Sequence, residues 1–172
     1  MWNNGIGAID PVLGTPNDYK LGDGFRFGFR FDLDTHEHLG YEMSYFYSRS
    51  SLMYTVPPNQ SSTGFGIHTV SGDALWHLTK RDSRVRPFVM GGLGFSNFVP
   101  PGASVSSGGG SNEFQLNYGL GVKFKVGSKW GHDWGIRADA RQFQYFNKPF
   151  GLFLSEGKLQ QTEATVGFGI LF

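Results

Sequence analysis

The side chains that could do chemistry in this sequence are scattered and form no compact motif. His36 and His38 lie two residues apart in a polar stretch, but two ligands alone make a poor metal site. Ser71, Asp73 and His77 would share one face of a strand, as a Ser–His hydrolase requires. Ser71 and His77 are six positions apart, about 20 Å in an extended strand, so these two side chains cannot meet. We predict no catalytic residue, no metal site and no cofactor, and hence no enzyme.

Most charged residues instead alternate with apolar ones. Residues 24–34 read Gly-Phe-Arg-Phe-Gly-Phe-Arg-Phe-Asp-Leu-Asp, which puts the phenylalanines on one face of a strand and Arg26, Arg30 and Asp32 on the other. A helix would scatter these phenylalanines around its circumference. The same alternation recurs over 37–48, 69–79, 85–96, 113–126, 134–145 and 163–172. We predict seven strands joined by hairpins, and we find no helix signal of comparable strength.

The connections between these segments alternate in length. Polar turns of a few residues are expected at 34–37, 79–84 and 127–133, whereas long links are expected near 50–64, 97–112 and 146–159. Outer-membrane barrels have this pattern, with short turns in the periplasm and long loops outside. A soluble meander has no need for it.

Composition bounds the fold class. The chain has 172 residues, enough for a single domain over 1–172, and its net charge of +1 gives no reason to expect a nucleic-acid partner. It has no cysteine, so disulfides and thiolate metal sites are excluded. No apolar run approaches the ~18 residues of a membrane helix. The mean hydropathy of −0.27 is that of a soluble protein, yet 26 glycines and 16% aromatic residues call for another explanation.

The polar face of the strands decides between a soluble and a membrane barrel. It carries many glycines, which weaken a solvated sheet surface but leave room inside a narrow lumen. Positive and negative charges on this face could neutralise one another in such a lumen. The soluble alternative would turn the apolar faces inward. We predict a lumen charge network of Arg26, Arg30, Asp32, Glu42, Asp73, Arg86, Lys123, Lys125, Arg137, Asp139, Arg141 and Glu163.

An even strand number requires one strand more than the seven that are clear. The segment 24–34 should run toward the periplasm, so an upward strand must precede it, and residues 2–9 are the candidate, followed by an outer loop near 10–23. This strand is either short or completed upstream. The predicted fold class is an all-β, eight-stranded antiparallel up-and-down transmembrane β-barrel. An exported protein needs a signal peptide, and Met1 to Asn4 has neither its basic nor its apolar region, so we expect it to have been removed.

This layout resembles the small outer-membrane β-barrel superfamily that includes the OmpA transmembrane domain and OmpX. The resemblance covers about residues 2–172 and rests on strand pattern, loop alternation and the C-terminal segment from Thr165 to Phe172. It implies a location in the bacterial outer membrane and contact with outer-membrane lipid. It also implies that the barrel assembly machinery is a partner during biogenesis, through an alternating C-terminal signal. The residues that match this signal are Val166, Phe168, Ile170 and Phe172.

Function is less constrained, because this fold hosts structural, adhesive and enzymatic members. We expect a filled lumen without large conductance, since eight strands leave room only for side chains. Apolar residues in the long links are candidates for contact with an envelope protein, unless the strands simply extend there; they include Tyr54, Phe150, Leu152 and Phe153. A structural or interaction role is the leading hypothesis. The alternatives are a barrel subunit of a larger envelope complex and a lipid-modifying enzyme.

Overall fold

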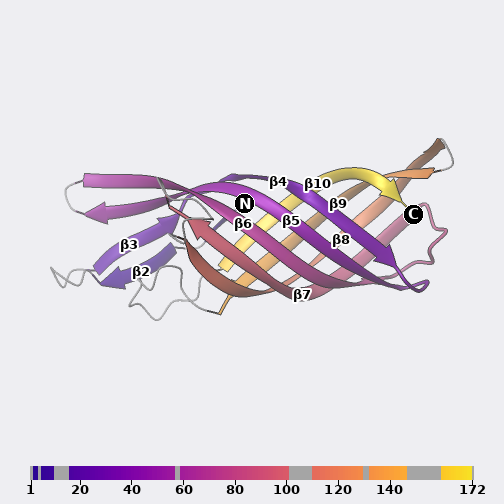
Figure 1. Ribbon diagram of the computed structural model, residues 1–172, viewed down its shortest axis with the longest axis horizontal. Helices are drawn as coiled ribbons and strands as arrows, with labels where there is room; N and C mark the ends of the chain where they lie inside the picture. Colours follow the sequence, from indigo (N-terminus) through magenta and orange to yellow (C-terminus); the bar gives the residue numbers. More distant parts are fainter. Residues whose placement is uncertain are drawn as a thin grey trace.

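The alternating segments form β-strands, and strands are the only regular elements among the described residues (Figure 1). The computed structural model describes residues 2–3, 5–9, 16–56, 59–100, 110–129, 132–146 and 160–171; within 2–21 and 52–61, and at 63, 129, 132 and 171, it describes the backbone alone. The strands are β1 Trp2–Asn3, β2 Gly5–Ile9, β3 Pro16–Leu21, β4 Phe25–Asp34, β5 Leu39–Val56, β6 Asn59–His77, β7 Val85–Val99, β8 Ser111–Lys129, β9 His132–Tyr145 and β10 Gln160–Leu171.

The strands β4 to β10 pair in chain order, each antiparallel to the next, and curl into a barrel-like wall (Figure 1). Connections at 35–38, 78–84 and 130–131 join them at one end, which we call the short-turn end. At the opposite end, the hairpin end, β2 and β3 pair with each other, and β3 pairs with the far part of β5. This arrangement confirms the predicted all-β, antiparallel up-and-down fold.

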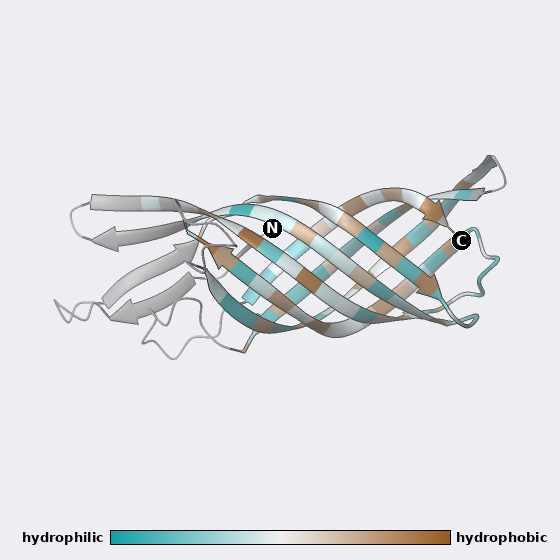
Figure 2. Ribbon diagram, viewed as in Figure 1, coloured by the Kyte–Doolittle hydropathy of each residue, from teal (hydrophilic) through white to brown (hydrophobic). Residues whose placement is uncertain are grey.

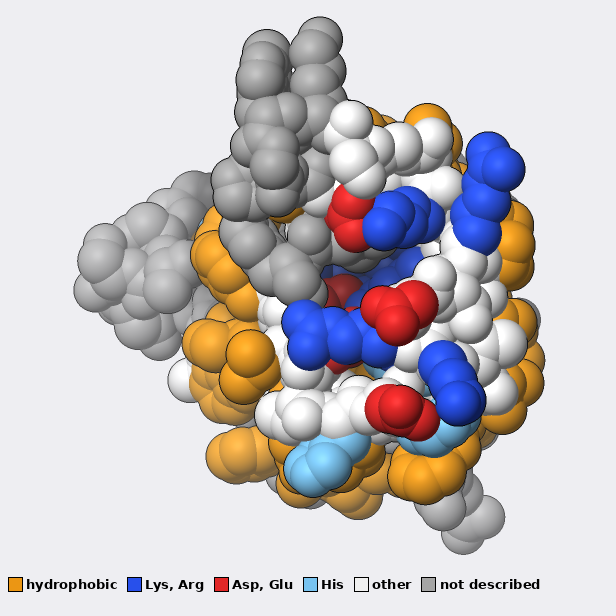
Figure 3. Space-filling view, turned by 90° about the vertical axis from the view of Figure 1, so that its right-hand side faces the viewer, with side chains coloured by type: hydrophobic (Ala, Val, Ile, Leu, Met, Phe, Trp, Pro, Cys, Tyr) orange, Lys and Arg blue, Asp and Glu red, His pale blue; other side chains and the backbone are white. Residues whose placement is uncertain are grey.

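The wall carries its apolar residues outside. Phe25 is 75% exposed, Phe31 is 68% exposed and Val166 is 80% exposed, whereas Glu42 and Arg141 on the opposite face are 3% and 2% exposed. Figure 2 shows hydrophobic and hydrophilic residues alternating along the strands, and Figure 3 shows charged side chains within a hollow at the short-turn end, inside a rim of apolar ones. A soluble barrel would have the reverse arrangement. The wall is therefore built for hydrocarbon on its outer surface.

Glycine on the inner face makes room for large side chains. Gly121 on β8 lies opposite Asp139 on β9. A Cβ atom at Gly121 would lie 2.6 Å from the Cβ of Asp139 and 2.6 Å from the Cζ of Phe88. Gly72 on β6 belongs to the outward register, and a Cβ atom there would meet nothing within 4 Å. The high glycine content thus reflects packing inside the wall.

Two predicted segments differ from the structure. The link expected near 50–64 is almost entirely strand, because β5 continues to Val56 and β6 begins at Asn59. The β5–β6 pairing continues there although apolar and polar residues do not alternate. Residues 2–9 are extended, but only Trp2 and Asn3 pair with β10, while β2 pairs with β3. In the described part of the chain, no eighth strand accompanies the rest of β10.

The inner-face glycine gives a direct test. Gly121→Ala should lower the free energy of unfolding by about 1–3 kcal/mol, because the added methyl group forces Phe88 or the backbone of β9 to move. Gly72→Ala adds the same methyl group to open space and should leave stability nearly unchanged. Urea unfolding of the two variants in detergent micelles measures the difference in unfolding free energy. The gel mobility of unheated samples reports the folded fraction at each urea concentration. Equal stability of the two variants would contradict this packing role.

Candidate functional site in the barrel interior

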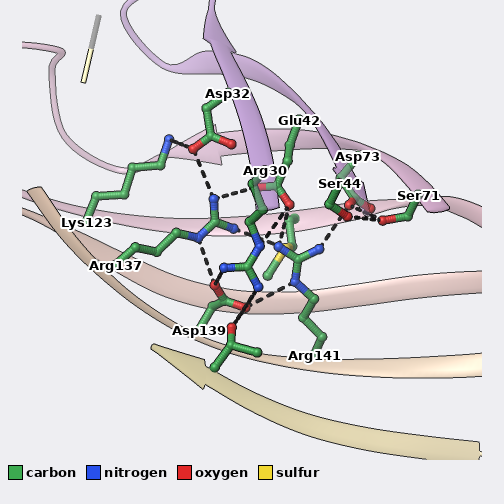
Figure 4. Close-up of polar contacts among 12 residues, drawn as sticks. Arg30, Asp32, Glu42, Ser44, Ser71, Asp73, Lys123, Arg137, Asp139 and Arg141 are labelled. Atoms are coloured by element: carbon green, nitrogen blue, oxygen red, sulfur yellow. Dashed lines mark hydrogen bonds and ion pairs between the residues drawn. The ribbon is translucent and has the colours of Figure 1, made fainter. Parts of the chain in front are cut away.

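Three carboxylates lie in one row across the inner wall. The strand registers pair Asp32 on β4 with Glu42 on β5, and Glu42 with Asp73 on β6. Like charges directly opposite each other destabilise a sheet, so this row requires cations close by. The far wall provides them, because β9 carries Arg137, Asp139 and Arg141 at alternate positions and all three point inward (Figure 4).

Arg141 sits at the centre of the charged cluster. Its side chain is 1% exposed, and its three nitrogens each meet a different carboxylate. Nη1 lies 3.1 Å from Asp73, Nε lies 3.1 Å from Asp139, and Nη2 donates to Glu42. Because the planar guanidinium holds its donors in a fixed fork, these contacts tie β9 to β5 and β6 at defined positions.

Arg137, four positions before Arg141 on β9, has the same bridging role. Its Nη1 donates to Glu42 and lies 3.1 Å from Asp32, and its Nε lies 2.8 Å from Asp139. The guanidinium carbon also lies 4.5 Å from the centroid of the Phe88 ring. Glu42 and Asp139 are thus each shared between two arginines of β9, which joins the contacts into one network.

Arg30 connects this network to the edges of the wall. From β4, its Nη1 lies 3.3 Å from Asp139 on β9, and its Nη2 donates to Thr165 on β10 over 2.7 Å. The Thr165 hydroxyl in turn donates to Asp139 over 3.0 Å. Side chains from β4 and β10 therefore meet across the interior.

A second group of contacts lies toward the short-turn end. Lys123 on β8 lies 2.8 Å from Asp32 and 3.9 Å from Asp34, and Arg86 on β7 pairs with Asp34. His77 is fully buried, with its Nε2 3.9 Å from Asp34. Since Asp32 also contacts Arg137, the two groups are continuous.

The structure brings most of the sequence-derived charge set into contact, with two separations. Arg26 pairs with Glu163 at 2.9 Å apart from the central cluster, and its guanidinium carbon lies 4.4 Å from the Phe46 ring centroid. Lys125 is 38% exposed and pairs with Asp133 near the short-turn end, outside the buried network. The remaining nine residues are linked through the contacts described above.

The other sequence-derived positions lie elsewhere. Val166, Phe168 and Ile170 are exposed on the outer face of β10. Phe172, Phe150, Leu152 and Phe153 lie outside the described residues, and Tyr54 is described by its backbone alone, paired with Tyr19.

Several members of the network are absent from the set predicted from the sequence, because that set contains only charged residues at inward positions of the predicted strands. Asp34 belongs to the turn expected at 34–37, but it ends β4 and pairs with Arg86. Asn117 donates to Asp73, and its inward register position was a sufficient signal. Thr165 also occupies an inward position, but nothing local to it marks Arg30, which is 135 positions away, as its partner.

The candidate catalytic groups have structural partners. The Ser71 hydroxyl donates to Asp73 over 3.1 Å and lies 2.7 Å from the Ser44 hydroxyl, whereas His77 lies beside Asp34. His38 approaches the backbone oxygen of His77 at 2.7 Å and stacks on Trp76. Over the residues with described side chains, no three His, Asp or Glu residues are grouped as a metal site.

Comparison with known protein families shows which family this chain belongs to. The family model for the outer membrane protein beta-barrel domain matches residues 5–172. The chain belongs to this family. No curated protein and no solved structure matches it. This outer-membrane barrel is thus placed in the outer membrane, and its short-turn end is expected to face the periplasm. In the described segments, no helix is long and apolar enough to cross a membrane.

The central arginine of this outer-membrane barrel can be tested by truncation. Arg141→Met should cost about 3–5 kcal/mol of unfolding free energy, because Glu42, Asp73 and Asp139 each lose a buried cation. Lys125→Met removes a cation from a partly exposed pair and should cost no more than about 1 kcal/mol. Urea unfolding of both variants under matched conditions gives the two values. A cost for Arg141→Met no larger than that for Lys125→Met would show that the network adds nothing to stability.

Proposed function

We propose that this outer-membrane barrel is a structural wall whose interior is filled by side chains, and that it acts through a β-sheet projecting from its hairpin end. The observation that carries the proposal is the length of β5 and β6, which have 18 and 19 residues. These two strands are longer than the membrane requires. We infer an interaction role for the projecting part rather than transport or catalysis.

The projection can be measured from the strand pairing. β4 pairs with β5 only as far as Arg49, and β7 pairs with β6 only from Gly66. Residues 50–56 of β5 therefore continue beyond β4, and this stretch is about 23 Å long at ~3.3 Å per residue. The β2–β3 hairpin pairs with β5 in this region, which makes a four-stranded sheet in the order β2, β3, β5, β6.

One edge of the projecting sheet suits the addition of another strand. Residues 59–64 of β6 pair with β5 on one side and with no described strand on the other. This stretch reads Asn-Gln-Ser-Ser-Thr-Gly, without the charges or prolines that usually protect an edge. An extended segment of a surface-exposed protein could pair with it through the backbone.

The direction of the backbone groups supports this role. The nitrogen of Gly22 donates to the oxygen of Ser51, so the polar groups of Ser51 point away from β6. Its partner Gly64 therefore directs its own N–H and C=O to the outer edge, and Ser62 does the same two residues earlier. These groups are available to a partner strand without any loss of pairing to β5.

The interior supports a structural wall that is neither a pore nor an enzyme. The charged network crosses the interior from β4, β5 and β6 to β9, and Phe46, Phe88, Phe143 and Tyr145 are buried in the same interior. Opening a water-filled path would require breaking buried ion pairs, which costs several kcal/mol for each pair. The polar groups of Ser71 and Asp73 serve as partners in this network, which is consistent with a structural role.

The filled interior predicts an electrical result. Purified protein in a planar lipid bilayer should give no steady conductance on the nanosiemens scale, because buried side chains occupy the path. A known porin inserted under the same conditions is the control. Reproducible nanosiemens steps from this protein would overturn the filled-interior proposal.

The edge strand predicts a partner that depends on one backbone N–H. With a photo-crosslinking amino acid at Gln60 in living cells, we expect one discrete protein adduct at the surface. Ser62→Pro should abolish this adduct, because proline removes an edge donor while leaving the pairing to β5 intact. Ser62→Ala keeps the donor and should keep the adduct. No adduct, or an adduct equally strong in both variants, would contradict strand addition; unheated gel mobility checks that both barrels are folded.

A further inference from the structure

The turn between β6 and β7 carries a group of cations at the short-turn end. Residues 79–84 read Thr-Lys-Arg-Asp-Ser-Arg, in which Asp82 is the single acid. Lys80, Arg81 and Arg84 are exposed, and Figure 3 shows Lys and Arg side chains on the rim of the hollow at this end. This basic turn belongs neither to the buried charged network nor to the sheet at the hairpin end.

Hydrogen bonds fix the backbone of the basic turn at both of its outer cations. The nitrogen of Ser83 donates to the oxygen of Lys80 over 3.1 Å, and the nitrogen of Lys125 on β8 donates to the oxygen of Arg84 over 2.8 Å. A ligand at this turn therefore meets charges that are already in place, and binding does not require the backbone to become ordered.

The charged residues of the turn divide into two groups. Arg81 and Asp82 line a cleft of about 830 Å³, together with inner-wall residues such as Arg86. Lys80 and Arg84 do not line this cleft, and among the described side chains they take part in no ion pair. The acid of the turn thus lies toward the interior, whereas two unpaired cations remain on the outside.

An exposed apolar surface adjoins these two cations. Trp76 near the end of β6 is 54% exposed, and Leu78 directly after this strand is 61% exposed. Val85, which follows Arg84 in the chain, is 43% exposed on β7. Tryptophan is typical of the interface between membrane and water. Lys80 and Arg84 therefore lie just beyond the apolar band, at the level where the phosphate groups of lipids lie.

We propose that Lys80 and Arg84 bind the phosphate group of an anionic phospholipid in the periplasmic leaflet of the membrane. The acyl chains of this lipid lie along the apolar surface of Trp76, Leu78 and Val85. Ammonium and guanidinium groups both form charge-assisted hydrogen bonds with phosphate. An acidic peptide would match the cations but would leave the apolar surface uncovered. The proposal requires the short-turn end to face the periplasm and is independent of the projecting sheet at the hairpin end.

Native mass spectrometry of the detergent-purified protein tests the head-group preference. With equal amounts of phosphatidylglycerol and phosphatidylethanolamine that carry the same acyl chains, the protein should retain phosphatidylglycerol preferentially. The double variant Lys80→Gln, Arg84→Gln should bind phosphatidylglycerol about 25-fold more weakly, because each cation near a lipid surface contributes about fivefold in affinity. Equal retention of the two lipids by the native protein would overturn the proposal, and so would an unchanged preference in the double variant.

Matched variants separate this site from a general effect of charge. Arg49→Gln removes an exposed cation from the hairpin-end part of β5 and should leave phosphatidylglycerol binding unchanged. The variant Lys80→Arg, Arg84→Lys keeps both charges and should keep the preference. A loss of binding in Arg49→Gln as large as in the double variant, or a loss of the preference when both charges are kept, would overturn the assignment. Unheated gel mobility checks that each variant is folded.

A competition experiment tests whether the ligand is a lipid rather than a free phosphate. The deacylated head group of phosphatidylglycerol carries the same charge but lacks the chains that lie on the apolar surface. It should therefore fail to displace phosphatidylglycerol from the native protein at equal concentration. Displacement by the deacylated head group would overturn the phospholipid assignment and identify a site for free phosphate esters.

Discussion

The fold depends on one constraint: inside a membrane, every backbone polar group must find its partner within the protein. Antiparallel pairing from β4 to β10 meets this constraint for the interior of the wall. Once the backbone is paired, the side chains must alternate between lipid and interior, which explains why Phe25 to Phe31 present a phenylalanine at every second position. The inside-out distribution of apolar and charged residues follows from this pairing and is not an independent feature.

A narrow interior imposes a second condition, because charges placed there have little water around them. The row of Asp32, Glu42 and Asp73 on one wall would be unfavourable alone. Arg137 and Arg141 on β9 face this row and neutralise its negative charge. Asp139 lies between the two arginines and pairs with both, which offsets their mutual repulsion. The charged residues thus act as cross-links between strands far apart in the sequence. Glycines such as Gly121 are the counterpart of these long side chains, since each gives up volume that a neighbour occupies.

Alternation made the membrane-spanning strands predictable from the sequence. Each strand has one face toward lipid and one toward the interior, so apolar and polar residues alternate with a period of two. Alternation could not reveal the β-structure at 50–64, where the paired residues do not alternate between apolar and polar types. The inward charges were readable for the same reason as the strands. Their partners were not, since Arg30 meets Asp139 over a separation of 109 positions that only barrel closure and side-chain length determine. Asp34 lay at a strand end, where alternation does not distinguish a turn residue from an inward one.

Among the described residues, the open strand edges at the hairpin end and along the apolar surface have opposite meanings, because their surroundings differ. The edge of β6 over residues 59–64 extends beyond the neighbouring strand, and water can satisfy its N–H and C=O groups until a partner strand replaces it. The edges of β4 and β10 lie among lipid-facing phenylalanines, where no solvent can take that role. We therefore propose that the first edge is a binding surface, whereas the backbone groups of the second must find partners other than water. The same backbone chemistry supports an interaction role outside the membrane and requires permanent closure within it.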